Sequence, residues 1–506
     1  MTDNKQYLMA LDFGTGAGRC FMVSLDGQTS YDQYREFSYD YPEEAQPGGS
    51  QFDPQAFWAI FADLIRKTIN EAGIDPAQVV GISSTAQREG VVFLDKDGEE
   101  LYAGPNLDMR APCDMAEFNT KFAERIHKAS GHWPFPMFAP YRLLWFKEKQ
   151  PELYEKIASV LLLNNWILYR LCGQKGTEPS NGVETVLMDL KTRDWDVDLI
   201  RDIGFDPSFF PSSSESGTVI GNVTEKAEKE TGLKAGTPVV LGGADSQCAL
   251  LGTAAVNAGD VGVVLGTFGP VQMVVPEPII AEPELIWSGC HTVPGSWVIE
   301  STTMETGQTF RWIRDVFYSS ESIDTYGLMN KEAEASPPGA NGVKSYIGPR
   351  LPNYRKLEFV IPGGFITQLP PTPGTVQRGD FARAALESVA FGVRLNVERL
   401  QRISGLQISV LRASGGLSKS ALLMQMMANL LKVKVTVPLQ KEGSALGAAI
   451  CAGVGAGIFN NMQAGVDQLV MIEKEYLPQD KQVYEALYQN WMADYKKMYG
   501  ANTLKE

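Results

Sequence analysis

The sequence predicts an α/β protein built from two domains of similar size, on three observations. The chain has 506 residues, more than one hydrophobic core usually supports, so two domains of roughly 250 residues are expected. The order strand-turn-strand, helix, strand, helix appears once in each half, which indicates duplication of one unit. The apolar fraction of 44% and charged fraction of 21% are those of a globular chain. The predicted domains are therefore residues 1–254 and 255–506.

The first half is expected to open with a β-meander followed by an amphipathic helix. Strands are predicted at residues 7–12, 20–25, 34–39, 79–83, 91–94 and 238–241. A hairpin signal, Asp26-Gly27, separates the second strand from the third. A helix is predicted over 53–72, because Asp53 and Pro54 provide an N-cap and a first helical residue before apolar residues at helical spacing. The middle of the chain, from about 111 to 235, has mostly helical patterns.

The second half repeats the strand-turn-strand pattern around Gly266. Two helices are predicted at 383–403 and 420–431, with a buried strand at 410–413 between them. The tail from about 475 to 506 carries aromatic residues at helical spacing, which predicts a packed terminal helix rather than a binding element.

Charge and cysteine content exclude several classes of protein. The formal net charge of −15, without a Lys/Arg-rich stripe, disfavours nucleic-acid binding. The six cysteines are scattered and form no C-x-x-C pair, which argues for reduced thiols and against a zinc site. There is no signal-peptide core and no uncharged apolar run of about 18 residues. We therefore expect a cytoplasmic protein with no membrane partner.

Two glycine-threonine turns, half the chain apart, carry the strongest functional signal. The first holds Asp12, Gly14, Thr15, Gly16 and Arg19, and the second holds Gly266, Thr267 and Gly269. Glycine lets backbone N–H groups curl toward an anion, threonine adds a hydroxyl donor, and Asp12 at a strand end can hold a hydrated divalent cation. The alternative is a pair of hairpins whose glycines only satisfy backbone geometry. Two facing turns would clamp the phosphates of a nucleotide.

Asp245 follows a buried strand and two glycines where the chain enters a helix. It is either an N-cap or a base, because a strand-to-helix turn can place a carboxylate beside a reacting hydroxyl. Gly415, Gly416 and Lys419 form a further loop that leads into a helix, as in nucleotide sites. The spacing matches neither a Walker motif nor a dinucleotide-binding fingerprint.

A polar cluster of both charge signs follows two strand ends. It comprises Gln87, Arg88, Glu89, Asp108 and Arg110, with Asn181 as a further candidate. A solvated loop with surface ion pairs is one interpretation. Binding of a polyol is the other, because each hydroxyl both gives and accepts a hydrogen bond.

In combination, these motifs resemble the FGGY carbohydrate kinases, over nearly the whole chain. The resemblance implies two actin-like (ribonuclease H-like) ATPase domains around a cleft, with sugar bound by the first domain and ATP by the second. The family's first phosphate motif matches Asp12, Gly14, Thr15 and Arg19; its catalytic base matches Asp245; its second phosphate motif matches Gly266, Thr267 and Gly269; and its adenosine motif matches Gly415, Gly416 and Lys419. Its polyol contacts fall on Gln87, Arg88, Glu89 and Asp108. The implied cofactors are ATP and Mg²⁺, with Asp12 and Asp245 on the metal side.

Several segments are most similar to the autoinducer-2 kinases of this family, among them R-E-G-x-V and N-x-D-x-R-A. This similarity implies a small, five-carbon, ketose-like acceptor. Xylulokinase or another pentulose or polyol kinase is the alternative, and a non-catalytic nucleotide-dependent sugar sensor is an alternative of another class. Asn106 stands where glycerol and xylulose kinases often carry Trp, which implies a differently shaped pocket. The oligomeric state, a homodimer included, stays open.

Overall fold

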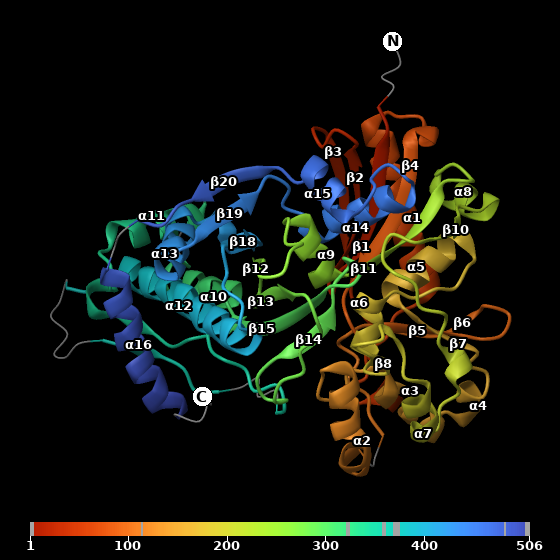
Figure 1. The fold of residues 1–506 in the computed structure, drawn as a ribbon, viewed down its shortest axis with the longest axis horizontal. Helices are drawn as coiled ribbons and strands as arrows, with labels where there is room; N and C mark the ends of the chain where they lie inside the picture. Colours follow the sequence, from red (N-terminus) through yellow and green to blue (C-terminus); the bar gives the residue numbers. More distant parts are fainter. Residues whose placement is uncertain are drawn as a thin grey trace.

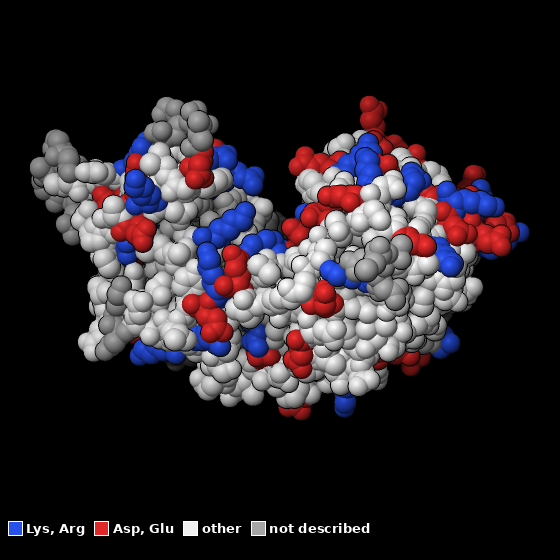
Figure 2. Space-filling view, turned by 90° about the horizontal axis from the view of Figure 1, so that it is seen from above, with Lys and Arg blue, Asp and Glu red and all other residues white. Residues whose placement is uncertain are grey.

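The computed structural model describes residues 5–112, 115–319, 324–356, 361–367, 375–479 and 482–500. It has two lobes side by side, each built on a mixed β-sheet with helices packed against it (Figure 1). The surface is hollowed between the lobes when the molecule is seen from above (Figure 2). The α/β class predicted from the sequence is thus confirmed.

The first sheet has the strand order β10-β11-β4-β1-β2-β3. Its strands are β1 Tyr7–Phe13, β2 Ala17–Ser24, β3 Ser30–Glu36, β4 Val79–Ala86, β10 Val219–Asn222 and β11 Pro238–Ala244. The neighbours β11, β4 and β1 run parallel, with Phe13 opposite Ala86 and Ala86 opposite Ala244. The residues that follow these strands therefore share one edge of the sheet. The third strand lies at 30–36 and not at 34–39, because the turn that follows Asp26 is already complete at Thr29.

One face of this sheet is covered by α1 (Pro54–Ala72) and α5 (Leu163–Cys172). Helix α1 agrees with its prediction because the Asp53 carboxylate accepts hydrogen bonds from the first-turn N–H groups of Gln55 and Ala56, and Gly73 ends the helix in the left-handed conformation.

The opposite face is covered by α9 (Asp245–Gly252) together with α14 (Gly443–Gly455) and α15 (Met462–Leu469), which come from far along the chain. Figure 1 shows these late helices against the earliest strands. Small residues make the approach close, since a Cβ on Gly447 would lie 2.0 Å from the carbonyl oxygen of Cys248. The structured body around the first sheet thus includes chain beyond residue 254.

The second sheet has the order β14-β15-β13-β12-β18-β19-β20. Its strands are β12 Val261–Val264, β13 Phe268–Val275, β14 Trp287–Cys290, β15 Trp297–Glu305, β18 Val410–Ser414, β19 Lys434–Pro438 and β20 Ile472–Tyr476. The core of this lobe is shared with α10 Gly307–Phe317, α11 Thr325–Ala335, α12 Arg378–Ser404, α13 Ala421–Leu431 and α16 Val483–Tyr499. The predicted helices at 383–403 and 420–431 correspond to α12 and α13, and the predicted terminal helix to α16.

A smaller sheet, β6-β5-β7, extends the first lobe. The remaining strands are β5 Val91–Leu94, β6 Glu100–Gly104, β7 Ser159–Leu162, β8 Met188–Asp189, β9 Asp194–Trp195, β16 Lys344–Ser345 and β17 Phe365–Ile366. The remaining α-helices are α2 Met115–Ser130, α3 Ala139–Lys149, α4 Pro151–Tyr154, α6 Pro179–Gly182, α7 Val197–Ile203 and α8 Glu225–Thr231. Among the described helices, none combines the length and apolar composition that a membrane span requires.

Candidate active site

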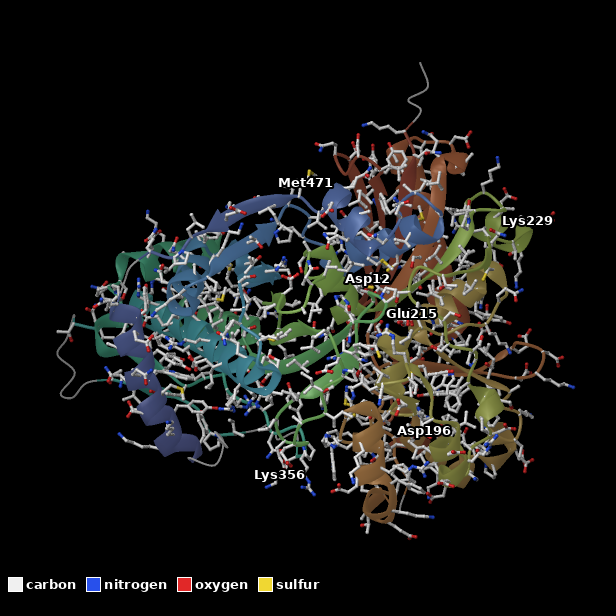
Figure 3. The ribbon with its side chains drawn as sticks, in the orientation of Figure 1. Asp12, Asp196, Glu215, Lys229, Lys356 and Met471 are labelled. Atoms are coloured by element: carbon white, nitrogen blue, oxygen red, sulfur yellow. The ribbon has the colours of Figure 1, made fainter. Side chains whose placement is uncertain are left out.

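Three predicted site segments meet at the edge of the first sheet. Asp12 lies near the end of β1, Gln87 to Glu89 follow β4, and Asp245 follows β11. Asp12 lies near the middle of the molecule, where the lobes meet (Figure 3). Burial raises the pKa of Asp12 to about 7, and the charge of Asp245 adds to this rise, while Arg19 opposes it. The two aspartates therefore form an electrostatically coupled acidic pair.

Asp245 has the environment of a general base. Its Oδ1 accepts hydrogen bonds from the Ser246 backbone N–H, at 2.6 Å, and from the Ser246 hydroxyl, at 3.0 Å. Burial raises its pKa, while the positive charge of Arg88 and the two Ser246 bonds oppose the rise. Since both bonds go to Oδ1, Oδ2 is the oxygen that can receive a proton from a substrate hydroxyl.

The acidic pair fits a magnesium ion that is bound together with phosphates. Within the described residues there is no cluster of three or more His, Cys, Asp or Glu that could hold a metal by itself. Mg²⁺ typically keeps several waters and binds through one or two carboxylates plus substrate phosphates. Asp12 and Asp245 supply that number of carboxylates, and a divalent cation would relieve their mutual repulsion.

The first glycine-threonine turn is open on one side. The Gly14 N–H donates to the Ala17 carbonyl at 2.9 Å, which closes the turn. Thr15 and Gly16 are exposed, and a Cβ on Gly16 would meet nothing within 4 Å. Arg19 lies opposite Asp12 in the sheet; its guanidinium pairs with Asp32, and its Nε lies 3.2 Å from a carboxylate oxygen of Glu442.

The second turn and the third loop lie together on the second sheet, since β12 and β18 are parallel neighbours. A cavity of about 570 Å³ joins them. Its lining includes Gly266, Thr267, Gly307, Phe310, Arg311, Tyr326, Asn330, Gly416, Lys419 and Ser420. A Cβ on Gly416 would meet nothing within 4 Å, so the backbone is open to a ligand there. The cavity has the glycine backbone, hydroxyl and ammonium groups that suit a nucleotide.

Two other predicted glycines are closed in by protein. A Cβ on Gly269 would lie 2.6 Å from the Thr303 hydroxyl, and one on Gly415 would lie 2.7 Å from the carbonyl carbon of Leu265. Gly415 also has a φ of 85°, which favours glycine. Both residues therefore shape the turns from behind and do not line the cavity.

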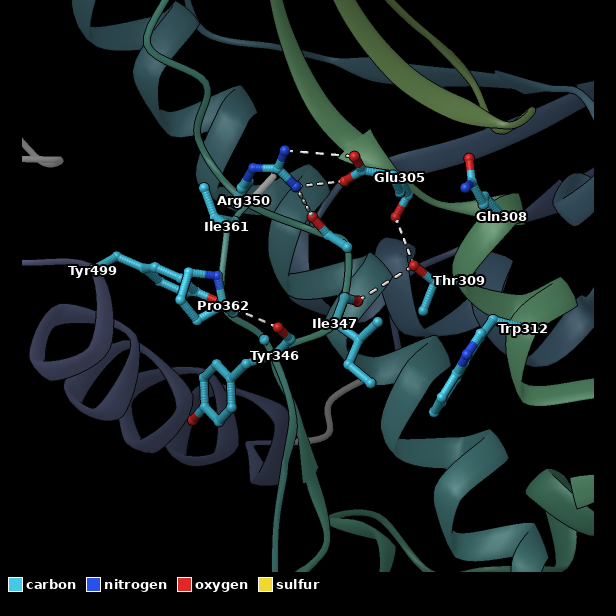
Figure 4. Close-up of a pocket in the computed structure, with 12 residues that line it drawn as sticks. Glu305, Gln308, Thr309, Trp312, Tyr346, Ile347, Arg350, Ile361, Pro362 and Tyr499 are labelled. Atoms are coloured by element: carbon cyan, nitrogen blue, oxygen red, sulfur yellow. Dashed lines mark hydrogen bonds and ion pairs between the residues drawn. The ribbon is translucent and has the colours of Figure 1, made fainter. Parts of the chain in front are cut away.

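A second cavity, of about 380 Å³, lies against another face of α10 (Figure 4). Several of its polar groups are bound within the protein (Figure 4). Arg350 pairs with Glu305, and the Tyr499 hydroxyl oxygen lies 3.1 Å from the carbonyl oxygens of both Tyr346 and Pro362, either of which can accept its one hydrogen. This cavity is separate from the turns and the acidic pair.

Arg88 is the centre of the predicted polar cluster, and carboxylates from both lobes surround it. Its guanidinium nitrogens lie 3.0 Å from Glu300, 3.7 Å from Glu184 and 3.9 Å from Glu89. Its guanidinium carbon lies 5.6 Å from the ring centre of Trp287. Burial raises the pKa of Glu89 to about 8, although the charge of Arg88 counteracts this rise.

Some polar atoms around Arg88 have no hydrogen-bond partner among the described residues. They are Glu89 Oε1, Gln247 Oε1 and Trp287 Nε1, and each belongs to a residue with at most 7% of its surface exposed. Buried polar atoms are normally paired, so three unpaired ones around Arg88 indicate that a ligand provides their partners. A ligand rich in hydroxyls can do so, because a hydroxyl both donates and accepts hydrogen bonds.

The other predicted sugar contacts are engaged inside the protein. Gln87 donates to the Gly14 carbonyl at 3.2 Å and to the Tyr39 hydroxyl at 3.0 Å. Asp108 lies 2.8 Å from Arg110 Nε. The Asn181 side-chain nitrogen donates to Asn164 Oδ1 at 2.9 Å, whereas Asn181 Oδ1 is buried and has no hydrogen-bond partner among the described residues.

Sequence reasoning missed Glu184, Trp287 and Glu300. Trp287 lies in β14 directly opposite Glu300 in β15, so the edge of the second sheet brings both residues to Arg88. Glu184 lies in a single helical turn after α6, and its carboxylate is 3.2 Å from His132 Nε2. Glu184 and Trp287 belong to no short motif that sequence alone could single out. Glu300 begins a segment that is similar to the autoinducer-2 kinases, but nothing in that segment indicates a role beside Arg88.

The paired turns, the acidic pair and the two lobes define an ATP-dependent phosphotransferase with two actin-like domains. The chain belongs to the FGGY family of carbohydrate kinases, whose N-terminal domain model matches residues 7–252 and whose C-terminal domain model matches residues 261–456. Members of this family are ATP-dependent sugar kinases, and so is this protein. The predicted family, fold and enzyme class are confirmed.

Relatives and solved structures cover nearly the full length. An autoinducer-2 kinase of Yersinia pseudotuberculosis serotype O:3 is 33% identical over 512 residues, covering 99% of this chain and 96% of the relative. A xylulose kinase from Rhodospirillum rubrum is 25% identical with a TM-score of 0.84, covering 98% and 99% of the two chains. Glycerol kinase from Plasmodium falciparum, solved with ADP, shares the fold at 20% identity and a TM-score of 0.84, covering 98% of each chain.

Proposed function

We propose that the protein transfers the γ-phosphoryl group of Mg·ATP to a terminal hydroxyl of a neutral, five-carbon, ketose-like sugar, as an autoinducer-2 kinase-like enzyme. The observation that carries this proposal is the Arg88 cluster beside the acidic pair. The full-length similarity to an autoinducer-2 kinase supports the choice of acceptor.

Mg·ATP supplies the phosphoryl group that is transferred. Gly266, Thr267, Gly416 and Lys419 hold the nucleotide in the cavity of the second lobe. Thr15 and Gly16 would reach the phosphates from the first lobe, and Asp12 would hold a magnesium ion, which would supply positive charge to the phosphates. Closure of the lobes excludes water, which competes with the sugar hydroxyl for the phosphoryl group.

Asp245 is the catalytic base of the proposed reaction, and it also contacts the metal and the sugar. Its Oδ2 would accept the proton of the sugar hydroxyl as the hydroxyl oxygen forms its bond to the γ-phosphorus and the bond from that phosphorus to the β,γ-bridging oxygen breaks, which releases ADP. For phosphoryl transfer the protein must chiefly position a base and stabilise the negative charge of the transferring phosphoryl group. Arg19 contributes positive charge to this side of the cleft.

The charge around Arg88 favours a neutral acceptor. With Glu89 largely protonated near neutral pH, the carboxylates of Glu184 and Glu300 still outnumber the one guanidinium, so an anionic sugar such as gluconate would meet a surplus of negative charge. A neutral ketose instead offers hydroxyl groups that can donate to carboxylates and a carbonyl that can accept from Arg88. Xylulose meets the same criterion, so xylulokinase activity is the second candidate.

A coupled ADP-release assay tests this proposal with xylulose, ribulose, glycerol, gluconate and the autoinducer-2 precursor. We expect the highest kcat/KM for the autoinducer-2 precursor, a lower value for the pentuloses, and negligible turnover of gluconate. Preference for gluconate would refute the charge argument. Binding of nucleotide and sugar without turnover would instead favour a sensor.

A further inference from the structure

Asn106 connects the sugar-side loop to the first phosphate turn. Its side-chain nitrogen, Nδ2, lies 3.2 Å from the hydroxyl oxygen of Thr15, and its Oδ1 lies 3.5 Å from the same oxygen. The shorter contact is the one in which Asn106 donates and Thr15 accepts. The two residues are 91 positions apart in the chain, so this contact exists only because the fold brings the two loops together.

The backbone of Asn106 is fixed independently of its side chain. Its N–H donates to Gln87 Oε1 at 2.9 Å, while Gln87 Nε2 donates to the carbonyl of Gly14 at 3.2 Å. Gln87 is fully buried and thereby holds the sugar-side loop and the phosphate turn against each other. A change in the Asn106 side chain therefore leaves the loop in place.

The direction of the Asn106 hydrogen bond decides what the Thr15 hydroxyl can do. A hydroxyl has one hydrogen to donate, and when its oxygen accepts from an amide, that hydrogen is left for another acceptor. Thr15 is exposed, and its neighbour Gly16 borders open space, so the hydrogen can point out of the turn.

We infer that Asn106 is a positioning residue for the nucleotide: its amide donates to Thr15 and thereby directs the Thr15 hydroxyl hydrogen toward a phosphate oxygen. This inference rests on the proposed binding of phosphates by Thr15. The loop beside the sugar cluster thereby adjusts the affinity for ATP.

The test measures equilibrium binding of Mg·ADP and of a non-hydrolysable Mg·ATP analogue by calorimetry, without sugar. Asn106→Ala removes the donor and should weaken binding about three- to tenfold, the usual effect of losing one hydrogen bond. Asn106→Asp should weaken it at least about tenfold more, because the carboxylate would accept the Thr15 hydrogen and add negative charge beside the phosphates. Leu107→Ala, a neighbour with 47% of its surface exposed, is the matched control and should leave affinity unchanged.

The order of the two Asn106 variants distinguishes positioning from a merely structural role. Equal affinity of the Asp and Ala variants, wild-type affinity in both, or an equal loss in Leu107→Ala would overturn the inference. Melting temperatures of all three variants should stay within about 2 °C of wild type, since the Gln87 bond to the backbone remains. The proposed acceptor is tested separately, by the ADP-release screen. If no sugar is phosphorylated there, the proposed function is wrong, but the comparison of nucleotide affinity among the Asn106 variants still tests this inference.

Discussion

Replacement of Asp12 by Asn should make the free enzyme more stable at pH 8 while abolishing its activity. The pKa of Asp12 is raised from 3.8 to about 7, chiefly by burial and then by Asp245. Because the folded-state value is the higher one, the stability that protonated Asp12 contributes is fully present below pH 3.8 and is lost as the pH rises to about 7. Asparagine resembles the protonated acid at every pH, so the variant avoids this loss.

The size of the effect follows from the two pKa values. The difference between 3.8 and about 7 corresponds to roughly 4 kcal/mol at 1.36 kcal/mol per pKa unit. The Asp12 side chain keeps some contact with solvent, so we expect about half of this, roughly 2 kcal/mol, at pH 8. For a lobe of about 250 residues this raises the melting temperature by roughly 4 to 8 °C.

Thermal unfolding between pH 5 and pH 8, in EDTA and without nucleotide, measures this difference. The advantage of Asp12→Asn should shrink steadily as the pH falls. Asp198→Asn, whose side chain is 85% exposed, controls for the loss of one carboxylate and should show no such trend. A pH-independent gap, or a wild type that is more stable at pH 8, would refute the reasoning. Addition of Mg·ATP should stabilise the wild type more than the variant.

Three further predictions concern the sugar side of the cleft. Asp245→Asn should lower sugar-dependent ADP release about 10²- to 10⁴-fold and leave sugar affinity within a few-fold; near wild-type turnover would assign the base elsewhere. Arg88→Ala and Glu300→Gln should each raise the sugar KM about tenfold and leave the KM for ATP unchanged, because both residues lie in the sugar cluster. Steady-state kinetics measures both constants. An unchanged sugar KM in both variants would contradict the prediction. Trp287→Phe deletes an N–H with no partner and should raise the sugar KM without loss of melting temperature. Trp297→Phe deletes a 2.7 Å hydrogen bond to the Leu190 carbonyl, so it should lower the melting temperature and leave the sugar KM unchanged. An equal loss of melting temperature in the two Trp variants would refute the distinction.

Local patterns were sufficient to predict much of the first sheet and its edge. Asp12 and Asp245 were found because each directly follows or ends a buried, strand-like run, and parallel strands bring such positions to one edge. Helix α1 was predicted to within a residue because Asp53 and Pro54 mark its start and apolar residues follow at helical spacing, signals that depend only on neighbouring sequence.

The partners of Arg88 were beyond the reach of local patterns. Glu300 is 212 positions away, in a strand whose pairing with its neighbours decides which side chains reach the cleft. Gln87 and Asp108 were identified as sugar contacts from their residue type, but residue type does not reveal that protein groups already occupy their polar atoms.

The helices α14 and α15 make the first lobe depend on residues far along the chain. The chain passes between the bodies of the two sheets at 253–260, 439–442 and 470–471. A fragment that stops at residue 254 would leave the face formed by Leu8, Ala10, Phe21 and Val23 in water, so it should aggregate rather than fold as an independent sugar-binding module. Any movement of one lobe must also bend three connections at once, which favours rotation about a single axis through these crossings over sliding of one lobe past the other.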